Sequence, residues 1–217
     1  MSVLVEICCD GIEAARRAVW RGAGRIELCA DLSCGGITPT FTDIFSSTNL
    51  GVPVNVLVRP RPGNFVYSWE EVEKMSREIA ACGQVGMNGV VIGVLRPDGR
   101  VDLPVCRDLI ALARSYGLSV TFHRAVDEAL AAGVPLDGLM EDILSLGVDR
   151  ILTSGGAAGA YDGRTVIARM AGIARRSGSC IVMPGGGVTP GNLAAILEAT
   201  GATEVHGSRL SLLSSSC

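Results

Sequence analysis

Short apolar runs that are typical of strands alternate with helix-like segments along the whole chain, and this alternation constrains the fold most. Eight runs are predicted as strands: Val3–Cys8, Arg25–Cys29, Val54–Arg59, Gly89–Gly93, Leu118–His123, Arg150–Thr153, Cys180–Met183 and Thr203–His206. The helix-like segments between them are 10–22, 39–49, 68–83, 103–116, 136–146, 163–176 and 190–199. Ser68 and Glu71 form a capping-box pattern at the start of one, and Pro190 suits the first turn of another. Such alternation predicts a parallel sheet.

The composition shows no break, so we expect a single domain over residues 1–217. Eight strands with intervening helices favour a (β/α)8 barrel of the TIM type. An open doubly wound sheet is the alternative, but its strands are usually apolar on both faces, whereas polar residues recur here within strands. Residues 207–217 are too few for a full eighth helix. We therefore expect a barrel that lacks a full final helix, with the outer faces of the first and eighth strands uncovered or covered by a partner subunit.

Charge and composition exclude several classes of partner and chemistry. The net charge is −3 and the pI is near 5.4, so we expect no nucleic-acid partner. No apolar run approaches the ~18 residues of a membrane span, and we expect no membrane insertion. No signal-peptide pattern precedes Val3, which argues against secretion and, for the eight cysteines, against a disulfide scaffold. Lys74 is the only lysine and falls inside a predicted helix, which argues against a Schiff-base aldolase.

Polar side chains share one face of four predicted strands. Because side chains alternate along a strand, residues two apart point the same way. Such pairs are Glu6 and Cys8, Glu27 and Cys29, Thr121 and His123, and Glu204 and His206. In a (β/α)8 barrel the carboxyl ends of the strands form the active face. A hydrogen-bonded core histidine, or a structural layer of ion pairs with Arg59, would explain members of this set singly, but their clustering favours a functional site.

One chemistry that the set allows is metal binding. Cys8 and Cys29 would lie on neighbouring strands, which are about 4.8 Å apart. Thiolates are preferred ligands of Cu(I), and a nearby histidine adds an imidazole. The same separation permits a disulfide, so the spacing alone leaves both possibilities open.

The alternative is an enzyme that acts on a small phosphorylated or carboxylated metabolite by acid/base catalysis. The glycine-rich loop after the seventh strand would offer amides to an anion, next to Gly207-Ser208-Arg209 after the eighth. The candidate anion-binding residues are Arg59, Arg61, Arg124, Gly185, Gly186 and Gly187. The candidate catalytic residues are Glu27, His123 and Glu204. A tight strand-to-helix turn would explain the glycines equally well.

Several motifs together resemble the CutC copper-homeostasis family, in the family's order and from Val3 to about Ser208. They are Ile26-Glu27-Leu28-Cys29, Gly35-Gly36-Ile37-Thr38-Pro39, Arg59-Pro60-Arg61, Thr121-Phe122-His123-Arg124-Ala125, Leu152-Thr153-Ser154-Gly155, Met183-Pro184-Gly185-Gly186-Gly187 and Glu204-Val205-His206. The resemblance implies a TIM-type barrel, a cytoplasmic and in animals also nuclear location, and a homo-oligomer. It further implies a role in copper tolerance or trafficking, with Cu(I) bound by Cys8 and Cys29.

The chain departs from the family pattern at three places. The family's Arg-Pro-Arg-Gly-Gly-Asp-Phe reads Arg59-Pro60-Arg61-Pro62-Gly63-Asn64-Phe65 here, and Asn64 cannot act as a base or counter-ion. Val126 replaces a phenylalanine, which we expect to affect packing only. The absence of a full final helix suggests a truncated isoform or a fragment.

Overall fold

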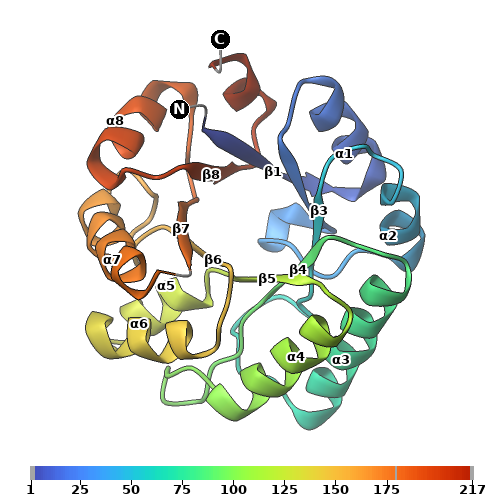
Figure 1. Ribbon diagram of the computed structural model, residues 1–217, viewed down its shortest axis with the longest axis horizontal. Helices are drawn as coiled ribbons and strands as arrows, with labels where there is room; N and C mark the ends of the chain where they lie inside the picture. Colours follow the sequence, from blue (N-terminus) through green and yellow to red (C-terminus); the bar gives the residue numbers. More distant parts are fainter. Residues whose placement is uncertain (1–2, 179, 216–217) are drawn as a thin grey trace.

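The computed structural model describes residues 3–178 and 180–215, and it confirms the (β/α)8 barrel. Eight parallel strands surround the centre of the molecule and the helices lie outside them (Figure 1). The strands are β1 (Leu4–Asp10), β2 (Arg25–Cys29), β3 (Val54–Leu57), β4 (Gly89–Ile92), β5 (Ser119–Phe122), β6 (Arg150–Thr153), β7 (Ile181–Pro184) and β8 (Glu204–Gly207). Each strand pairs with its neighbour in sequence and β1 also pairs with β8, whereas no ladder of the described residues joins β7 to β8. The barrel is therefore nearly closed.

The helices follow the predicted segments, with one addition. They are α1 (Gly11–Trp20), α2 (Phe41–Ser47), α3 (Trp69–Gln84), α4 (Leu103–Ser115), α5 (Ala125–Ala131), α6 (Leu136–Ser145), α7 (Arg164–Ser177) and α8 (Pro190–Thr200). The capping box at α3 is present, because Ser68 Oγ accepts from the Glu71 amide and Glu71 Oε2 accepts from the Ser68 amide. Pro190 opens α8 as expected. The short helix α5, directly after β5, was not predicted. No helix of the described residues is long and apolar enough to cross a membrane.

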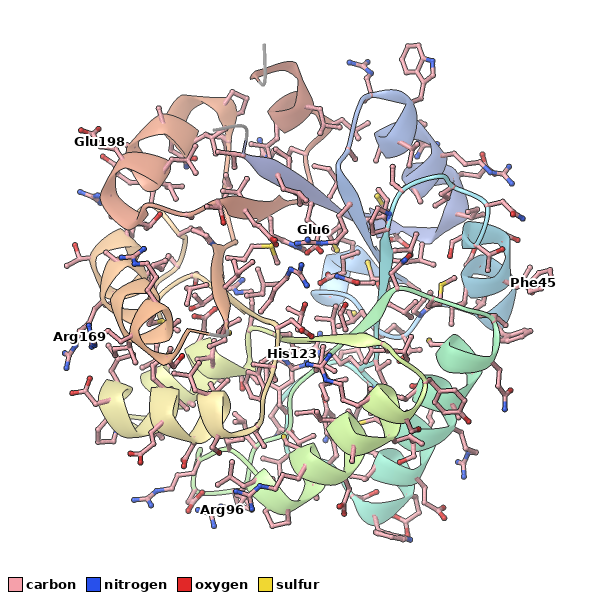
Figure 2. The ribbon with its side chains drawn as sticks, in the orientation of Figure 1. Glu6, Phe45, Arg96, His123, Arg169 and Glu198 are labelled. Carbon is pink, nitrogen blue, oxygen red and sulfur yellow. The ribbon has the colours of Figure 1, made fainter. Side chains whose placement is uncertain are left out.

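The two faces of the strands differ in chemistry as their alternation requires. Outward-facing side chains such as Ile7, Ile26 and Val205 are buried in the aliphatic layer between strands and helices. Inward-facing positions carry the polar residues. Figure 2 shows Glu6 and His123 in the middle of the ring of strands, while Arg169 on α7 lies at the outer edge of the molecule. The core therefore sits outside the barrel wall, and the polar residues are enclosed within it.

The outer faces of β1 and β8 are covered within the chain, so the expectation that they would lie bare or need a partner subunit was wrong. After β8 the described residues form only the 3-10 helix η2 (Leu210–Ser215), as the short remainder required. Leu212 of η2 is 0 % exposed and belongs to the main apolar core. Its Cδ1 occupies the space that a side chain at Gly207 would need, so this glycine permits the close approach. Leu212, together with the partly buried Leu210 and Leu213, thus packs against the core where a full eighth helix would lie.

Candidate functional site

A cavity of about 210 Å³ opens at the carboxyl ends of the strands. Its wall combines residues from strands far apart in sequence, among them Cys8, Glu27, Arg59, His123, Gly186 and His206. Four of the eight polar residues that were predicted to share the inner faces of the strands therefore converge in one enclosed space: Cys8, Glu27, His123 and His206. Glu6, Cys29 and Glu204 are buried in the barrel but do not line the cavity.

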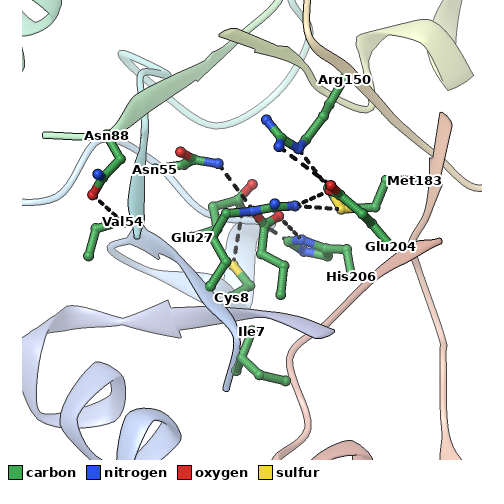
Figure 3. Close-up of polar contacts among 12 residues, drawn as sticks. Ile7, Cys8, Glu27, Val54, Asn55, Asn88, Arg150, Met183, Glu204 and His206 are labelled. Carbon is green, nitrogen blue, oxygen red and sulfur yellow. Dashed lines mark hydrogen bonds and ion pairs between the residues drawn. The ribbon is translucent and has the colours of Figure 1, made fainter. Parts of the chain in front are cut away.

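Beneath the cavity a layer of ion pairs fills the barrel (Figure 3). Arg25 donates to Glu6 Oε2 and to Glu204 Oε2, each at 2.5 Å, and Arg150 Nε donates to Glu204 Oε2 at 2.8 Å. Burial raises the pKa of Glu204, but the hydrogen bonds from Arg25 and Arg150 outweigh it, and the net pKa is lowered. Glu204, a predicted catalytic residue, is thus held in a structural layer of ion pairs. The sequence suggested such a layer with Arg59, but its cations are Arg25 and Arg150. Neither Arg25 nor Arg150 is among the site residues predicted from the sequence, although Arg25 lies two residues before Glu27 on β2 and therefore points to the same side.

His206 joins this layer to the cavity. Its Nδ1 lies 2.8 Å from Glu6 Oε1, and Asn55 Nδ2 donates to the other Glu6 oxygen at 3.2 Å. Burial raises the pKa of Glu6, but the His206 hydrogen bond and the charges of His206 and Arg25 lower it to about 2. Burial lowers the pKa of His206, while Glu27 and Glu6 raise it by more. Glu6 is therefore a carboxylate, and protonated His206 is its favoured partner.

The two cysteines predicted as ligands lie side by side. Cys8 Sγ is 3.5 Å from Cys29 Sγ, and Cys29 Sγ donates to the Cys9 carbonyl at 3.4 Å. Cys8 Sγ donates to Glu27 Oε1 at 3.1 Å. The hydrogen bond with Cys29, burial and the nearby carboxylate of Glu27 raise the pKa of Cys8 well above its usual value. Both are free cysteines. Because its pKa is raised, Cys8 stays a protonated thiol unless a metal ion displaces the proton to a nearby base.

Three candidate ligand atoms gather at this point. Cys8 Sγ, a Glu27 carboxylate oxygen and a His206 ring nitrogen all lie within 4.8 Å of one another. Among the described residues, Glu27 Oε2 has no hydrogen-bond partner although it is buried. Burial and the charge of Glu6 hold the pKa of Glu27 above its usual value, against the opposing charge of His206. With Cys29 behind Cys8, the donor set is two sulfurs, one carboxylate and one imidazole, which suits a soft or borderline metal.

The structure separates the predicted anion-binding residues. Arg59 lines the cavity, but its guanidinium donates to the carbonyls of Gly36 at 2.8 Å and Gly63 at 2.7 Å. Arg61 lies outside the cavity and donates to Glu71 at 2.6 Å. Arg124 lines the cavity, and so do Gly186 and Gly187, whereas Gly185 does not. A Cβ at Gly185 would collide with Leu152 and press on His206, so this glycine serves close packing.

His123 lines the cavity in a neutral state. Its Nδ1 accepts from the Ala125 amide at 3.2 Å, which places the ring proton on Nε2. Burial and the charge of Arg59 lower its pKa to about 3. Nε2 is buried and has no partner among the described residues. The ring is thus a fixed hydrogen-bond donor without an acceptor among the described residues.

Comparisons with known proteins agree on one family. A model described as the CutC family matches residues 3–211. A family protein CutC of Aliivibrio fischeri is 41 % identical over 207 residues, which cover 95 % of this chain and 81 % of that protein. The copper homeostasis protein cutC homolog of Homo sapiens is 42 % identical over 207 residues, 94 % of this chain and 72 % of its own. A crystal structure of CutC from Streptococcus agalactiae has a TM-score of 0.86 at 28 % identity, covering 96 % of this chain and 99 % of that one.

Proposed function

The chain belongs to the CutC family, and on that premise we propose that it is a copper-handling protein that binds Cu(I) through the thiolates of Cys8 and Cys29. The observation that supports this most is the 3.5 Å distance between the two sulfur atoms. Two free thiols this close, one of them at a cavity wall, can reach one soft ion with little movement of the strands.

Glu27 and His206 would assist copper binding, while the two thiolates would be the main ligands. Thiols must lose their protons before they bind a metal. Glu27 Oε1 already accepts the hydrogen bond of the Cys8 thiol at 3.1 Å, so it is the nearest base for that proton. His206 Nε2, 4.0 Å from Glu27 Oε1, would offer an imidazole nitrogen from the side of β8 once its proton is lost. Copper binding is therefore expected to release protons and to weaken as the pH falls.

Copper is favoured over zinc by the contact between the two sulfurs. The carboxylate and the imidazole complete a set of four donors that zinc could also use, and thiolates bind both ions. Two sulfurs in direct contact, with the harder donors at the side, favour the softer ion, Cu(I). The human relative carries copper homeostasis in its name, which agrees with this choice. A reducing compartment such as the cytoplasm would keep both thiols available.

The test is an anaerobic competition titration of the reduced protein against a chromogenic Cu(I) chelator. We expect one Cu(I) per chain, and a loss of affinity of at least about a hundredfold in Cys8→Ser and in Cys29→Ser, because even outer-shell partners contribute 10–100-fold. Cys9→Ser is the matched control, since Cys9 is buried on the same strand but belongs to the core between strands and helices. Tight binding that survives both ligand substitutions, or equal loss in Cys9→Ser, would overturn the proposal.

A further inference from the structure

The loop between β7 and α8 lines the cavity with Gly186, Gly187 and Val188. Gly186 has a φ of 92° and Gly187 a φ of 66°, the left-handed region that glycine adopts readily. The Gly186 carbonyl accepts from the Ala160 amide at 2.8 Å, and the Gly187 carbonyl accepts from Asn192 Nδ2 at 2.9 Å. Because N–H and C=O of a trans peptide point in opposite directions, the amides of Gly187 and Val188 point away from those partners. Successive amides in such a turn form a concave cradle for an anion.

Arg124 is fixed beside this loop with part of its guanidinium unused. Nε donates to Asp127 at 2.8 Å and Nη2 donates to Ser154 Oγ at 2.9 Å. Nη1 has no acceptor among the described residues, and a Cβ built on Gly186 would lie only 3.3 Å from it. Asp127 is itself held by Thr153 Oγ1 and by the amides of Ser154 and Gly156. The guanidinium is therefore preorganised, with one nitrogen left beside the amide cradle.

A second cation reaches the same wall from the other side. Ser208 and Arg209, directly after β8, line the cavity, and Arg209 is exposed. Asp127 offsets part of the charge of Arg124, so Arg209 supplies the additional positive charge. Two guanidinium groups and a run of amides are the donors that bind phosphate oxygens.

An unpaired buried donor points independently to a ligand. His123 is 4 % exposed, lines the same cavity, and carries its proton on Nε2, which has no partner among residues 3–178 and 180–215. Buried donors in native proteins nearly always have a partner. An oxygen atom on the organic part of a bound molecule would supply it. The cavity of about 210 Å³ is below the 300–1,000 Å³ of drug-sized sites, so the molecule must be small.

We propose that this cavity binds a small phosphomonoester. Its phosphate would lie between the Gly187–Val188 amides, Arg124 and Arg209, and an oxygen of its organic part would accept from His123 Nε2. The proposed ligand uses a different part of the wall from Cys8, and Cys29 lies behind that wall, so the proposal goes beyond the copper function. It also narrows the enzyme alternative, because Arg61 pairs with Glu71 outside the cavity and both terminal nitrogens of Arg59 donate to backbone carbonyls, although Arg59 Nε has no partner among the described residues.

Calorimetric titration of the reduced, metal-free full chain tests this proposal. The probes are inorganic phosphate, glycerol phosphate and glycerol. We expect saturable binding of both phosphates, tighter for the ester, and none of glycerol. Arg124→Gln and Arg209→Gln should each weaken phosphate binding at least about tenfold, as the loss of a charge-assisted contact does. Arg77→Gln is the matched control, because Arg77 is exposed on α3 and its one ion pair among the described residues is with Glu73 at 3.6 Å.

Further variants test which residues contact the phosphate and which contact the organic part of the ligand. His123→Asn should reduce the affinity for glycerol phosphate to that for inorganic phosphate while the latter is unchanged. Arg209→Gln removes an exposed side chain, so it reports on the site even if Arg124→Gln disturbs the fold. Absence of saturable phosphate binding at millimolar concentration would overturn the proposal. So would binding that both arginine variants retain, since that would place the phosphate elsewhere. Because the protein is metal-free, these results do not depend on whether copper binds.

Discussion

Glu27 Oε1 accepts a hydrogen bond from Cys8 Sγ at 3.1 Å, and the two residues are direct partners in the register of β1 and β2. The strand pairing itself therefore places an acid next to a thiol. The negative charge disfavours the thiolate of Cys8, while the carboxylate is positioned to receive its proton. The free protein thus keeps an unreactive thiol, and a metal ion that replaces the proton would find its ligand already in place.

Removal of this charge should make Cys8 more acidic. In Glu27→Gln the carboxylate is gone, and although the hydrogen bond with Cys29 and burial still raise the pKa of Cys8, we expect it to be lower than in the wild type. Alkylation of Cys8 as a function of pH, followed by mass spectrometry of its peptide in metal-free protein, measures the shift. Glu198→Gln on the surface of α8 is the control (Figure 2). An unchanged profile in Glu27→Gln would show that its charge does not act on Cys8.

Stability should depend on pH at both ends because of the Glu6–His206 pair. The pKa of Glu6 is lowered to about 2, so its contribution, on the order of 3 kcal/mol, is present above pH 4.5 and is lost as the pH falls toward 2. The pKa of His206 is raised, so its contribution is present below pH 6.5 and is lost as the pH rises through the folded-state pKa. Urea unfolding across pH measures both limbs. His206→Gln should flatten the alkaline limb, and an unaltered limb would contradict this account.

Arg25 should be essential to stability although it lies away from the cavity. It is buried between Glu6 and Glu204, so Arg25→Met leaves two carboxylates short of their partner. Breaking a buried pair in this way costs about 3–5 kcal/mol. Arg16→Met, which removes an exposed pair with Glu13, should cost less than about 1 kcal/mol. Urea denaturation compares the two, and a loss in Arg25→Met no larger than in the control would refute the ion-pair layer.

Leu212 should hold η2 against β1 and β8. It is fully buried, and Leu212→Ala is expected to lower the free energy of unfolding by about 2–5 kcal/mol. Leu210→Ala, at a partly buried position of the same segment, should cost less. Equal effects in calorimetric melting would mean that η2 does not dock through Leu212.

Self-association, which the family resemblance implies, stays a prediction. The bare strand faces that suggested it are covered by η2, so an interface would have to form elsewhere. Trp20, Phe41 and Phe45 are exposed aromatic side chains on α1 and α2. Sedimentation velocity of the full chain should show a species larger than the monomer. A single monomeric species at all concentrations would contradict it.

The sequence predicted the parts of this molecule that depend on periodicity. Alternation along strands placed Cys8 with Glu6 and Cys29 with Glu27 inside the barrel, because the period of a strand is two regardless of its surroundings. Alternation tells which side of a strand a residue faces, but not its depth along the barrel axis. Glu204 was therefore predicted at the cavity, although it lies beneath the cavity and pairs with Arg25 and Arg150.

The sequence could not predict features set by loop geometry. Arg59 was expected to face an anion, but the turns around it direct carbonyls at its guanidinium. The burial of Leu212 likewise depends on a contact with Gly207 that no local pattern encodes. The unpaired Nε2 of His123 emerges only when every neighbour is placed. These tertiary contacts distinguish a side chain that is available to a ligand from one that is already satisfied.

The most direct test of the central claim is X-ray absorption at the copper edge of the protein loaded with one Cu(I). We expect two sulfur neighbours in the wild type and one sulfur in Cys29→Ser, since Cys8 and Cys29 are the one pair of sulfurs in contact among the described residues of the barrel mouth. A spectrum with nitrogen or oxygen neighbours alone, or two sulfurs that persist in Cys29→Ser, would contradict it.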